Sequence, residues 1–239
     1  MVFGGIVSPL KAIDFLTIAS TGNSISFGDM TVLRSSFASM SDCVRGVFAG
    51  GDGSPAQFDE IDYFNIATTG DAVDFGDLVH AGFPGGSMNS TTRGIIARQN
   101  GPVGPNAVMD TIITRTLGNA TDFGDCVSGT GSNVTGGICN ATRGVLAGGY
   151  LHNIIQFITM ATTGDATDFG DLTQSSDNLR GASSKTRGIT AGASTPSNSN
   201  VIESVQIATT GNSVDFGDMA YVSGDVGQIT MNSNAHGGI

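Results

Sequence analysis

Residues 61–78 read IDYFNIATTGDAVDFGDL, and this stretch decides the fold because the chain holds four more versions of it. The other copies are IDFLTIASTGNSISFGDM (13–30), MDTIITRTLGNATDFGDC (109–126), IQFITMATTGDATDFGDL (155–172) and IESVQIATTGNSVDFGDM (202–219). Their shared Phe-Gly-Asp recurs after 48, 48, 46 and 47 residues. Self-similarity at a fixed period of about 20–50 residues indicates a repeat architecture.

Each unit predicts four short strands. The apolar runs are rich in Ile, Val, Phe and Thr and are bounded by Gly, Asn, Asp and Ser, which is typical of strands. A small polar segment such as GASSKT (181–186) supplies the first strand. The second is the block RGVFAGG (45–51), which recurs as RGIIARQ (93–99), RGVLAGG (143–149) and RGITAGA (187–193). IDYFNIAT and AVDFGDL supply the third and fourth strands, joined by a tight turn in which glycine provides the positive φ.

Four antiparallel strands repeated in this way describe the blade of a β-propeller. We therefore expect an all-β fold, a five-bladed β-propeller of four-stranded antiparallel blades. The chain starts with MVFGG (1–5), which matches the end of RGVFAGG, and its last segment, 227–239, looks like a first strand. The C-terminal strand is thus expected to complete the N-terminal blade, closing the ring and removing free sheet edges. The single domain, 1–239, divides into blade 1 (1–30 plus 227–239), blade 2 (35–78), blade 3 (85–126), blade 4 (135–172) and blade 5 (180–219).

Composition excludes several classes of protein. The net charge of −11 disfavours binding to nucleic acid or to an anionic membrane surface, because both need basic side chains. The chain contains no run of 18 apolar residues, so we expect no helix that spans a membrane, and the first residues do not have the pattern of a secretory signal. Cys43, Cys126 and Cys139 fit neither a zinc pattern nor a disulfide framework, so we expect three buried or half-buried thiols.

The order of these strands resembles the kelch repeat. Gly50-Gly51 and Gly148-Gly149 stand where kelch has its double glycine, and the repeated Phe stands where kelch has tryptophan, although this chain contains no Trp. The wording ATTGDATDFGDL (161–172) is similar to kelch-like repeats of virion structural and tail-fibre proteins of tailed phages. The resemblance implies a non-enzymatic propeller of a tail fibre or capsid decoration, located in the virion, an extracellular particle. Its partners would be other virion proteins or a host-surface receptor, a glycan among the choices, with its own copies arrayed by the particle.

The residues that recur in every unit predict structural roles. Each phenylalanine is expected to be buried against the next blade, and the glycine beside it to allow close backbone approach. The aspartates could accept backbone N–H bonds, pair with the repeated arginines across blades, or bind calcium; we favour the structural roles and expect no metal and no cofactor. The repeat residues are Phe27, Phe75, Phe123, Phe169, Phe216, Asp29, Asp77, Asp125, Asp171, Asp218, Arg45, Arg93, Arg143 and Arg187.

Variation between the units points to a binding surface. In a four-stranded blade the 1–2 and 3–4 connections, which are uniform here, lie at one end of the disc, and the varied 2–3 and 4–1 connections lie at the other. Binding residues concentrate in loops held by a rigid scaffold. The aromatic and imidazole candidates at the varied end are Phe58, Phe83, Tyr150, His152 and Tyr221.

Two other functions stay open at this point. One is a lectin-like carbohydrate-binding propeller with similar pockets between its blades, which repeated polar groups in each inter-blade cleft would favour. The other is an enzyme, which a single irregular cleft with perturbed titratable groups would favour. The chain has three histidines, at unrelated repeat positions and outside any recognisable catalytic signature, so we expect no enzyme and no catalytic residue.

Overall fold

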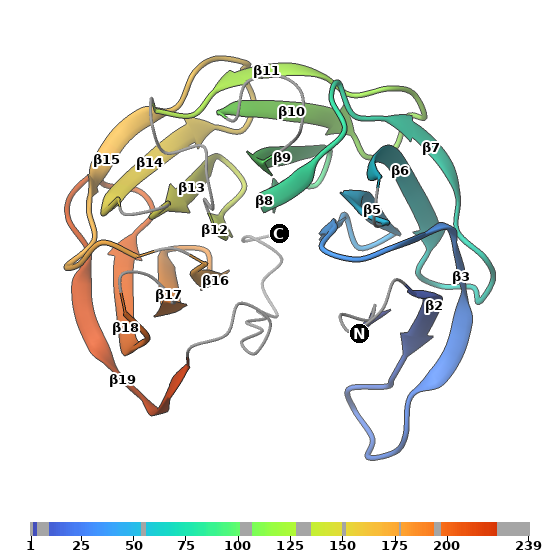
Figure 1. The fold of residues 1–239 in the computed structure, drawn as a ribbon, viewed down its shortest axis with the longest axis horizontal. Helices are drawn as coiled ribbons and strands as arrows, with labels where there is room; N and C mark the ends of the chain where they lie inside the picture. The colour runs from blue at the N-terminus through green and yellow to red at the C-terminus, as the bar shows by residue number, and fades with distance from the viewer. Residues whose placement is uncertain are drawn as a thin grey trace.

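The computed structural model describes residues 2–3, 10–53, 56–100, 107–127, 135–149, 152–176, 178–193 and 197–223. These residues form five antiparallel sheets, one of three strands and four of four strands. The sheets stand around a common centre as the five blades of a β-propeller, which confirms the expected fold class (Figure 1). Among the described residues no helix is long and apolar enough to cross a membrane.

The strands follow the order expected from the repeat. Blade 1 consists of β1 (Val2–Phe3), β2 (Leu10–Phe15) and β3 (Ile25–Arg34). Blade 2 consists of β4 (Ala38–Ser41), β5 (Arg45–Asp52), β6 (Gln57–Asn65) and β7 (Val73–Asp77). Blade 3 consists of β8 (Phe83–Asn89), β9 (Arg93–Asn100), β10 (Val108–Ile113) and β11 (Thr121–Asp125). Blade 4 consists of β12 (Thr135–Cys139), β13 (Arg143–Ala147), β14 (Ile154–Thr159) and β15 (Thr167–Asp171). Blade 5 consists of β16 (Arg180–Ser183), β17 (Arg187–Ala193), β18 (Ser199–Gln206) and β19 (Val214–Ser223).

The hydrophobic core lies between consecutive blades. The first strands β8, β12 and β16 are innermost (Figure 1). Strands β4, β8, β12 and β16 contact one another in this order around the centre. The second strands are covered on both faces, as β5 shows with six consecutive buried residues. One apolar cluster joins Met88 and Met109 of blade 3 to Leu146 and Ile158 of blade 4. Adjacent blades therefore share their cores, which holds each blade against its neighbours.

A β-bulge shapes every outer strand. In β7, Asp74 pairs with Asp62 and Gly76 pairs with Ile61, so Phe75 is the extra residue. The Asp74 carboxylate accepts the Gly76 N–H at 3.0 Å, and Gly76 has a φ of +143°. Because a bulge re-aims a side chain, it turns the phenylalanine toward the neighbouring blade. The same register shift occurs in the other four blades.

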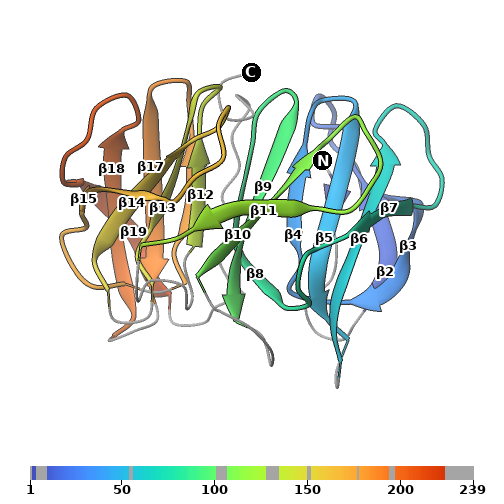
Figure 2. The same cartoon turned by 90° about the horizontal axis from the view of Figure 1, so that it is seen from above.

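The antiparallel order gives the disc two different ends (Figure 2). We call the end with the 1–2 and 3–4 connections the turn end, and the end with the 2–3 and 4–1 connections the loop end. In Figure 2 the inner strands β5, β9 and β17 run between these ends, and the outer strand β11 lies across them.

Blades 5 and 1 stand apart in the described part of the chain, so the blades form an open arc (Figure 1). Blade 1 begins at β1, which pairs with β2 as a second strand would. Residues 227–239, which were expected to supply its first strand, lie outside the described residues. Closure by the C-terminal strand therefore stays a prediction.

Candidate functional site

The junction between blades 3 and 4 shows what the repeated motif does. The N–H of Gly164 donates to the carbonyl of Phe123, and the N–H of Ala166 donates to the carbonyl of Asp125, both at 2.7 Å. In return, the N–H of Asp125 donates to Oδ1 of Asp165 at 2.9 Å. The turn of blade 4 thus adds to the outer edge of blade 3 in the manner of a short extra strand.

The other three described junctions repeat these bonds. Gly70, Gly118 and Gly211 donate to the phenylalanine carbonyl of the preceding blade at 2.8, 2.9 and 2.8 Å. In return, the turn side chains of Asp71, Asn119 and Asn212 accept hydrogen bonds through Oδ1. The donors are the backbone N–H groups of Asp29, Asp77 and Asp171, respectively. Sequence reasoning treated Thr-Gly-Asp/Asn only as a hairpin turn and missed this second role. The signal was present, because the acidic or amide residue after the turn glycine recurs in all five units.

The glycine of Phe-Gly-Asp is required by this close approach. A Cβ at Gly124 would lie 2.5 Å from the carbonyl carbon and oxygen of Gly164. The equivalent distances at Gly76 and Gly170, to the turns of blades 3 and 5, are also 2.5 Å. Any side chain here would therefore push the blades apart.

At each of the four described junctions, a side chain of the third strand accepts a backbone N–H that follows the Phe-Gly-Asp of the preceding blade. The N–H of Val127 donates to Oε1 of Gln156 at 2.7 Å, and the N–H of Val79 donates to Oδ2 of Asp110 at 3.0 Å. Asp62 and Glu203 accept the N–H groups of Thr31 and Thr173 in the same way. These acceptors were also missed, although an acid or amide recurs at this position in every unit.

Burial governs the charges at these positions. Burial raises the pKa of Asp110, and the hydrogen bond from Val79 and the charge of His80 only partly offset this. Asp62 instead forms a fully buried ion pair with Arg34, at 2.8 Å between Nη2 and Oδ2. Burial lowers the pKa of Arg34 against the opposing effect of the two nearby carboxylates. Such a buried pair is costly to break, because the remaining charge has no compensation.

Among the described residues, none of the repeated arginines forms an ion pair with a repeated aspartate, so the expected inter-blade contact between these two sets is wrong. Arg45, Arg93 and Arg143 donate through Nη1 to backbone carbonyls of the next blade, those of Thr114, Met160 and Ile207, at 3.0, 3.2 and 3.0 Å. Two of them stack on their own third strand: Arg45 lies 4.6 Å from the Tyr63 ring centroid and Arg143 4.3 Å from that of Phe157. An arginine fork satisfies a carbonyl as well as a carboxylate, so spacing alone could not identify the acceptor. Arg187, in blade 5, is exposed.

Four of the five repeated phenylalanines are buried at the junctions. Phe27, Phe75, Phe123 and Phe169 are 6, 3, 2 and 3% exposed, whereas Phe216 on the outer strand of blade 5 is 54% exposed. The aspartates Asp29, Asp77, Asp125 and Asp171 join the junctions through their backbone, and Asp218 lies on the outer strand of blade 5. Within the described ranges, no group of three or more His, Cys, Asp or Glu could hold a metal ion.

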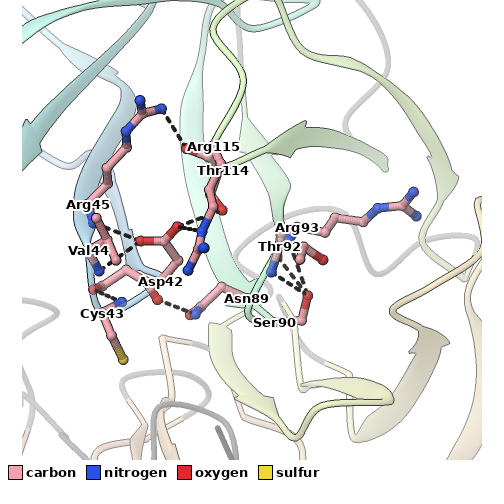
Figure 3. Close-up of polar contacts among 11 residues, drawn as sticks. Asp42, Cys43, Val44, Arg45, Asn89, Ser90, Thr92, Arg93, Thr114 and Arg115 are labelled. Atoms are coloured by element: carbon pink, nitrogen blue, oxygen red, sulfur yellow. Dashed lines mark hydrogen bonds and ion pairs between the residues drawn. The ribbon is translucent and has the colours of Figure 1, made fainter.

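One polar network at the turn end departs from the repeat (Figure 3). Asp42 caps the 1–2 turn of blade 2 where the other blades have Ser90, Asn140 and Ser184. Its Oδ1 accepts the N–H groups of Val44 and Arg45, and its Oδ2 accepts Nε of Arg115 at 3.1 Å and the hydroxyl of Thr114 at 3.2 Å.

Asp42 is 2% exposed, and each of its carboxylate oxygens accepts two hydrogen bonds. The bonds at Oδ1 stay within blade 2, and those at Oδ2 join blade 2 to blade 3. Burial by itself would raise the pKa of Asp42, but the backbone hydrogen bonds, with those of Arg115 and Thr114, leave the pKa below its ordinary value. The network therefore acts as a junction contact with an exposed arginine on its outer side.

The loop-end candidates do not form one cluster. The Phe58 ring lies on Gly53, and its carbonyl accepts the N–H of Gly82. Phe83 is half-buried in β8, and half-buried His152 is held by backbone bonds to Gly149 and Ser176. Tyr221, 85% exposed on β19, presents its ring to solvent. Tyr150 lies outside the described residues.

Two of the three thiols are buried within the blades. Burial raises the pKa of the Cys126 thiol to about 12 and also raises that of Cys139, so neither is a thiolate at neutral pH. Cys43 is exposed, contrary to the expectation that all three thiols would be at least half-buried. A small gap lined by Ile138, Ile155 and Val205 leaves no space for a water molecule, so it is a packing void.

Comparison with known proteins gives a fold and no family. No family model and no curated protein matches the chain. A solved structure described as that of YjhT matches with a TM-score of 0.72, at 10% identity, over 91% of this chain and 81% of that chain. At that identity the likeness concerns the fold alone, and it agrees with the arrangement of blades described above.

Proposed function

We propose that the chain is a non-enzymatic propeller module of a virion, in a tail fibre or a capsid decoration, which presents its loop end to a receptor or a neighbouring subunit. One observation carries the proposal. At the four described junctions the repeated polar groups bind backbone groups of the adjacent blade, so, apart from the Asp42 network, the differences between the blades lie at the loop end. The resemblance of the repeat wording to phage virion proteins supports the same function.

The junctions favour a rigid carrier. Each one combines two backbone hydrogen bonds, a turn side chain and a third-strand cap, all around a buried phenylalanine. Loops held on such a scaffold lose little freedom on binding, which favours affinity.

Tyr221 is the residue we expect to contact a partner. Its exposed ring at the loop end offers a large apolar face with a polar tip, which suits both protein interfaces and sugar stacking. Phe58, Phe83 and His152 are half-buried, and we assign them to the support of the loops.

The lectin-like alternative has less support. Its pockets would lie between blades and use repeated polar groups, yet Asp71, Asn119, Asp165 and Asn212 are already engaged by backbone N–H groups. A sugar would have to displace these bonds to use the same side chains.

Two measurements test the proposal. Purified virions of the phage that encodes this chain should contain its peptides in a fixed ratio to the other virion proteins. Their absence from the virions would refute the virion assignment.

Binding of the purified chain to host envelope or to partner virion proteins should fall about tenfold in Tyr221→Ala, the effect of a typical interface anchor. Leu117→Ala, which removes a 55% exposed side chain at the turn end, is the matched control and should bind normally. Equal losses in both variants would contradict a loop-end site.

A further inference from the structure

The outer strand of blade 5 and the hairpin turn of blade 1 have the residues that form a junction between other blades, but they are not in contact in the described structure. We propose that the hairpin turn of blade 1 (17–25) docks on β19 of the same chain, closing the ring by a fifth copy of the blade junction. This inference concerns an interaction surface and is independent of the function proposed above.

The β19 half is shaped for a turn and has none. Gly217 has a φ of +141°, like Gly124 at +138°, but among the described residues no atom beyond its chain neighbours lies within 4 Å of the position of its Cβ. Phe216 is 54% exposed where its counterparts are 2–6% exposed. Met219 is half-buried, whereas its counterparts Met30, Leu78, Cys126 and Leu172 are 2–7% exposed.

The blade 1 half shows the complementary exposure. Ile18 is 80% exposed, the most of any residue at this repeat position. Its counterparts Ile66, Thr114, Met160 and Ile207 are 41, 0, 1 and 0% exposed. Ser24 is exposed, whereas its counterpart Ser213 is 9% exposed. Ile18 and Ser24 are therefore exposed on the side of blade 1 that a preceding blade would contact.

The chemistry of the two halves matches bond for bond. From the junctions already made, the N–H of Gly22 should donate to the Phe216 carbonyl, and the N–H of Ser24 to the Asp218 carbonyl. The N–H of Asp218 should donate to Oδ1 of Asn23, as that of Asp171 does to Asn212 at 3.1 Å. Blade 1 and blade 5 even share the turn sequence Thr-Gly-Asn-Ser (21–24 and 210–213).

Two further bonds complete the junction. The carboxylate of Asp14 is placed to cap the N–H of Ala220, as Gln156 caps Val127. Exposed Arg187 would donate to the carbonyl of Ile18, as Arg143 does to that of Ile207. Five contacts that are made at other junctions thus find both partners at the ends of one chain.

The occupant of β19 is the same chain rather than a second copy. The junctions carry the blades around one centre without leaving the disc (Figures 1 and 2). If a second copy docked on β19 by the same contacts, its blades would follow the same circle and would overlap with blade 1 of the first copy. The tether between the two ends also gives the intramolecular contact a high effective concentration.

A paired disulfide experiment tests this in a Cys43→Ser background, which removes the exposed thiol. Asn23→Cys with Asp218→Cys probes the proposed junction, and Asn119→Cys with Asp77→Cys is the matched control at a junction already made. After oxidation by oxidised glutathione, we expect the test pair to form an intramolecular disulfide to within about twofold of the control. Dimers alone, or free thiols beside a cross-linked control, would overturn the proposal.

A second measurement does not depend on disulfide geometry. The chain contains no tryptophan, so Phe216→Trp, Phe169→Trp and Tyr221→Trp each place one reporter. Phe169→Trp marks a buried junction and Tyr221→Trp an exposed surface. We expect acrylamide to quench Phe216→Trp as weakly as Phe169→Trp at every protein concentration. Quenching as strong as in Tyr221→Trp, or protection that appears only on concentration, would overturn closure within one chain.

Discussion

The junction between blades 3 and 4 and the outer edge of blade 5 have the same sequence motif and different surroundings. In both, the first aspartate of Asp-Phe-Gly-Asp accepts the glycine N–H, at 3.0 Å in β11 and 2.9 Å in β19. In both, the glycine has a φ near +140°. Yet Phe123 is 2% exposed and Phe216 is 54% exposed. Each blade therefore forms the bulge by itself, and contact with the next blade only buries the phenylalanine.

The largest expected effect comes from removing the buried ring. Phe123→Ala should lower the free energy of unfolding by about 3–5 kcal/mol, because it leaves a cavity between two blades. Phe216→Ala should approach the same loss if the turn of blade 1 docks on β19 as we propose. Urea unfolding of both variants measures the comparison directly. A loss at Phe216 of half that at Phe123 or less would indicate that the edge stays open.

The close approach of the backbones gives the next effect. Gly118 and Gly124 have φ values of +142° and +138°, so alanine is strained equally at both. Only at Gly124 does the added Cβ meet another blade. Gly124→Ala should therefore cost about 1–3 kcal/mol more than Gly118→Ala, the usual cost of overpacking. Equal midpoints in urea would show that the blades separate without loss.

The turn carboxylate contributes less. Asp165→Ala removes the acceptor of the Asp125 N–H and should cost about 1 kcal/mol, since water can reach the freed donor. Asp165→Asn should be nearly neutral, because Asn119 and Asn212 accept the same bond in other blades. Thermal unfolding of the two variants gives the difference, and a loss as large in Asp165→Asn would mean that charge, not the hydrogen bond, matters.

The smallest expected effect is a change of stability with pH, which should have opposite signs at the buried residues Asp110 and Asp42. The pKa of Asp110 is raised, so the native protein loses stability as pH rises from the ordinary aspartate range through that pKa. The pKa of Asp42 is lowered, so its stabilisation is present above the ordinary range and is lost as pH falls through the folded pKa.

Asparagine at each position should reveal these opposite slopes. From about pH 3 to about pH 7, Asp110→Asn should become more favourable and Asp42→Asn less favourable relative to the native chain. Urea unfolding at both pH values is the measurement. Slopes of one sign would contradict the different hydrogen bonding of the two carboxylates.

Sequence alone could predict the blades because their signals are local. The alternation of apolar residues, the Thr-Gly-Asp/Asn turns and the period fix strands and hairpins within each unit. The burial of four of the five repeated phenylalanines also follows, since an aromatic residue that recurs once in each blade needs a partner surface. The tight turn was expected as a hairpin, but its bond to another blade joins residues about 40 positions apart.

The candidate site could be predicted only in part, for a physical reason. Backbone carbonyls leave no mark in a sequence, so the true acceptor of Arg143, the Ile207 carbonyl, could not be read. Exposure at the loop end is equally hidden, because it depends on what packs nearby. Phe58 and Tyr221 look alike as aromatic loop residues, but Phe58 lies on Gly53 and Tyr221 faces solvent.

The direction of the junction bonds has a consequence for synthesis. Each outer strand is secured by a turn that leaves the ribosome 40 to 42 residues later, so every new blade locks the one made before it. Because each of these junctions joins consecutive blades, the blades can fold one after another during translation. The turn of blade 1 is the exception, since its proposed partner around Phe216 is made last. Protease sensitivity of that turn would therefore mark nascent or truncated chains, and its disappearance would time the final step of folding.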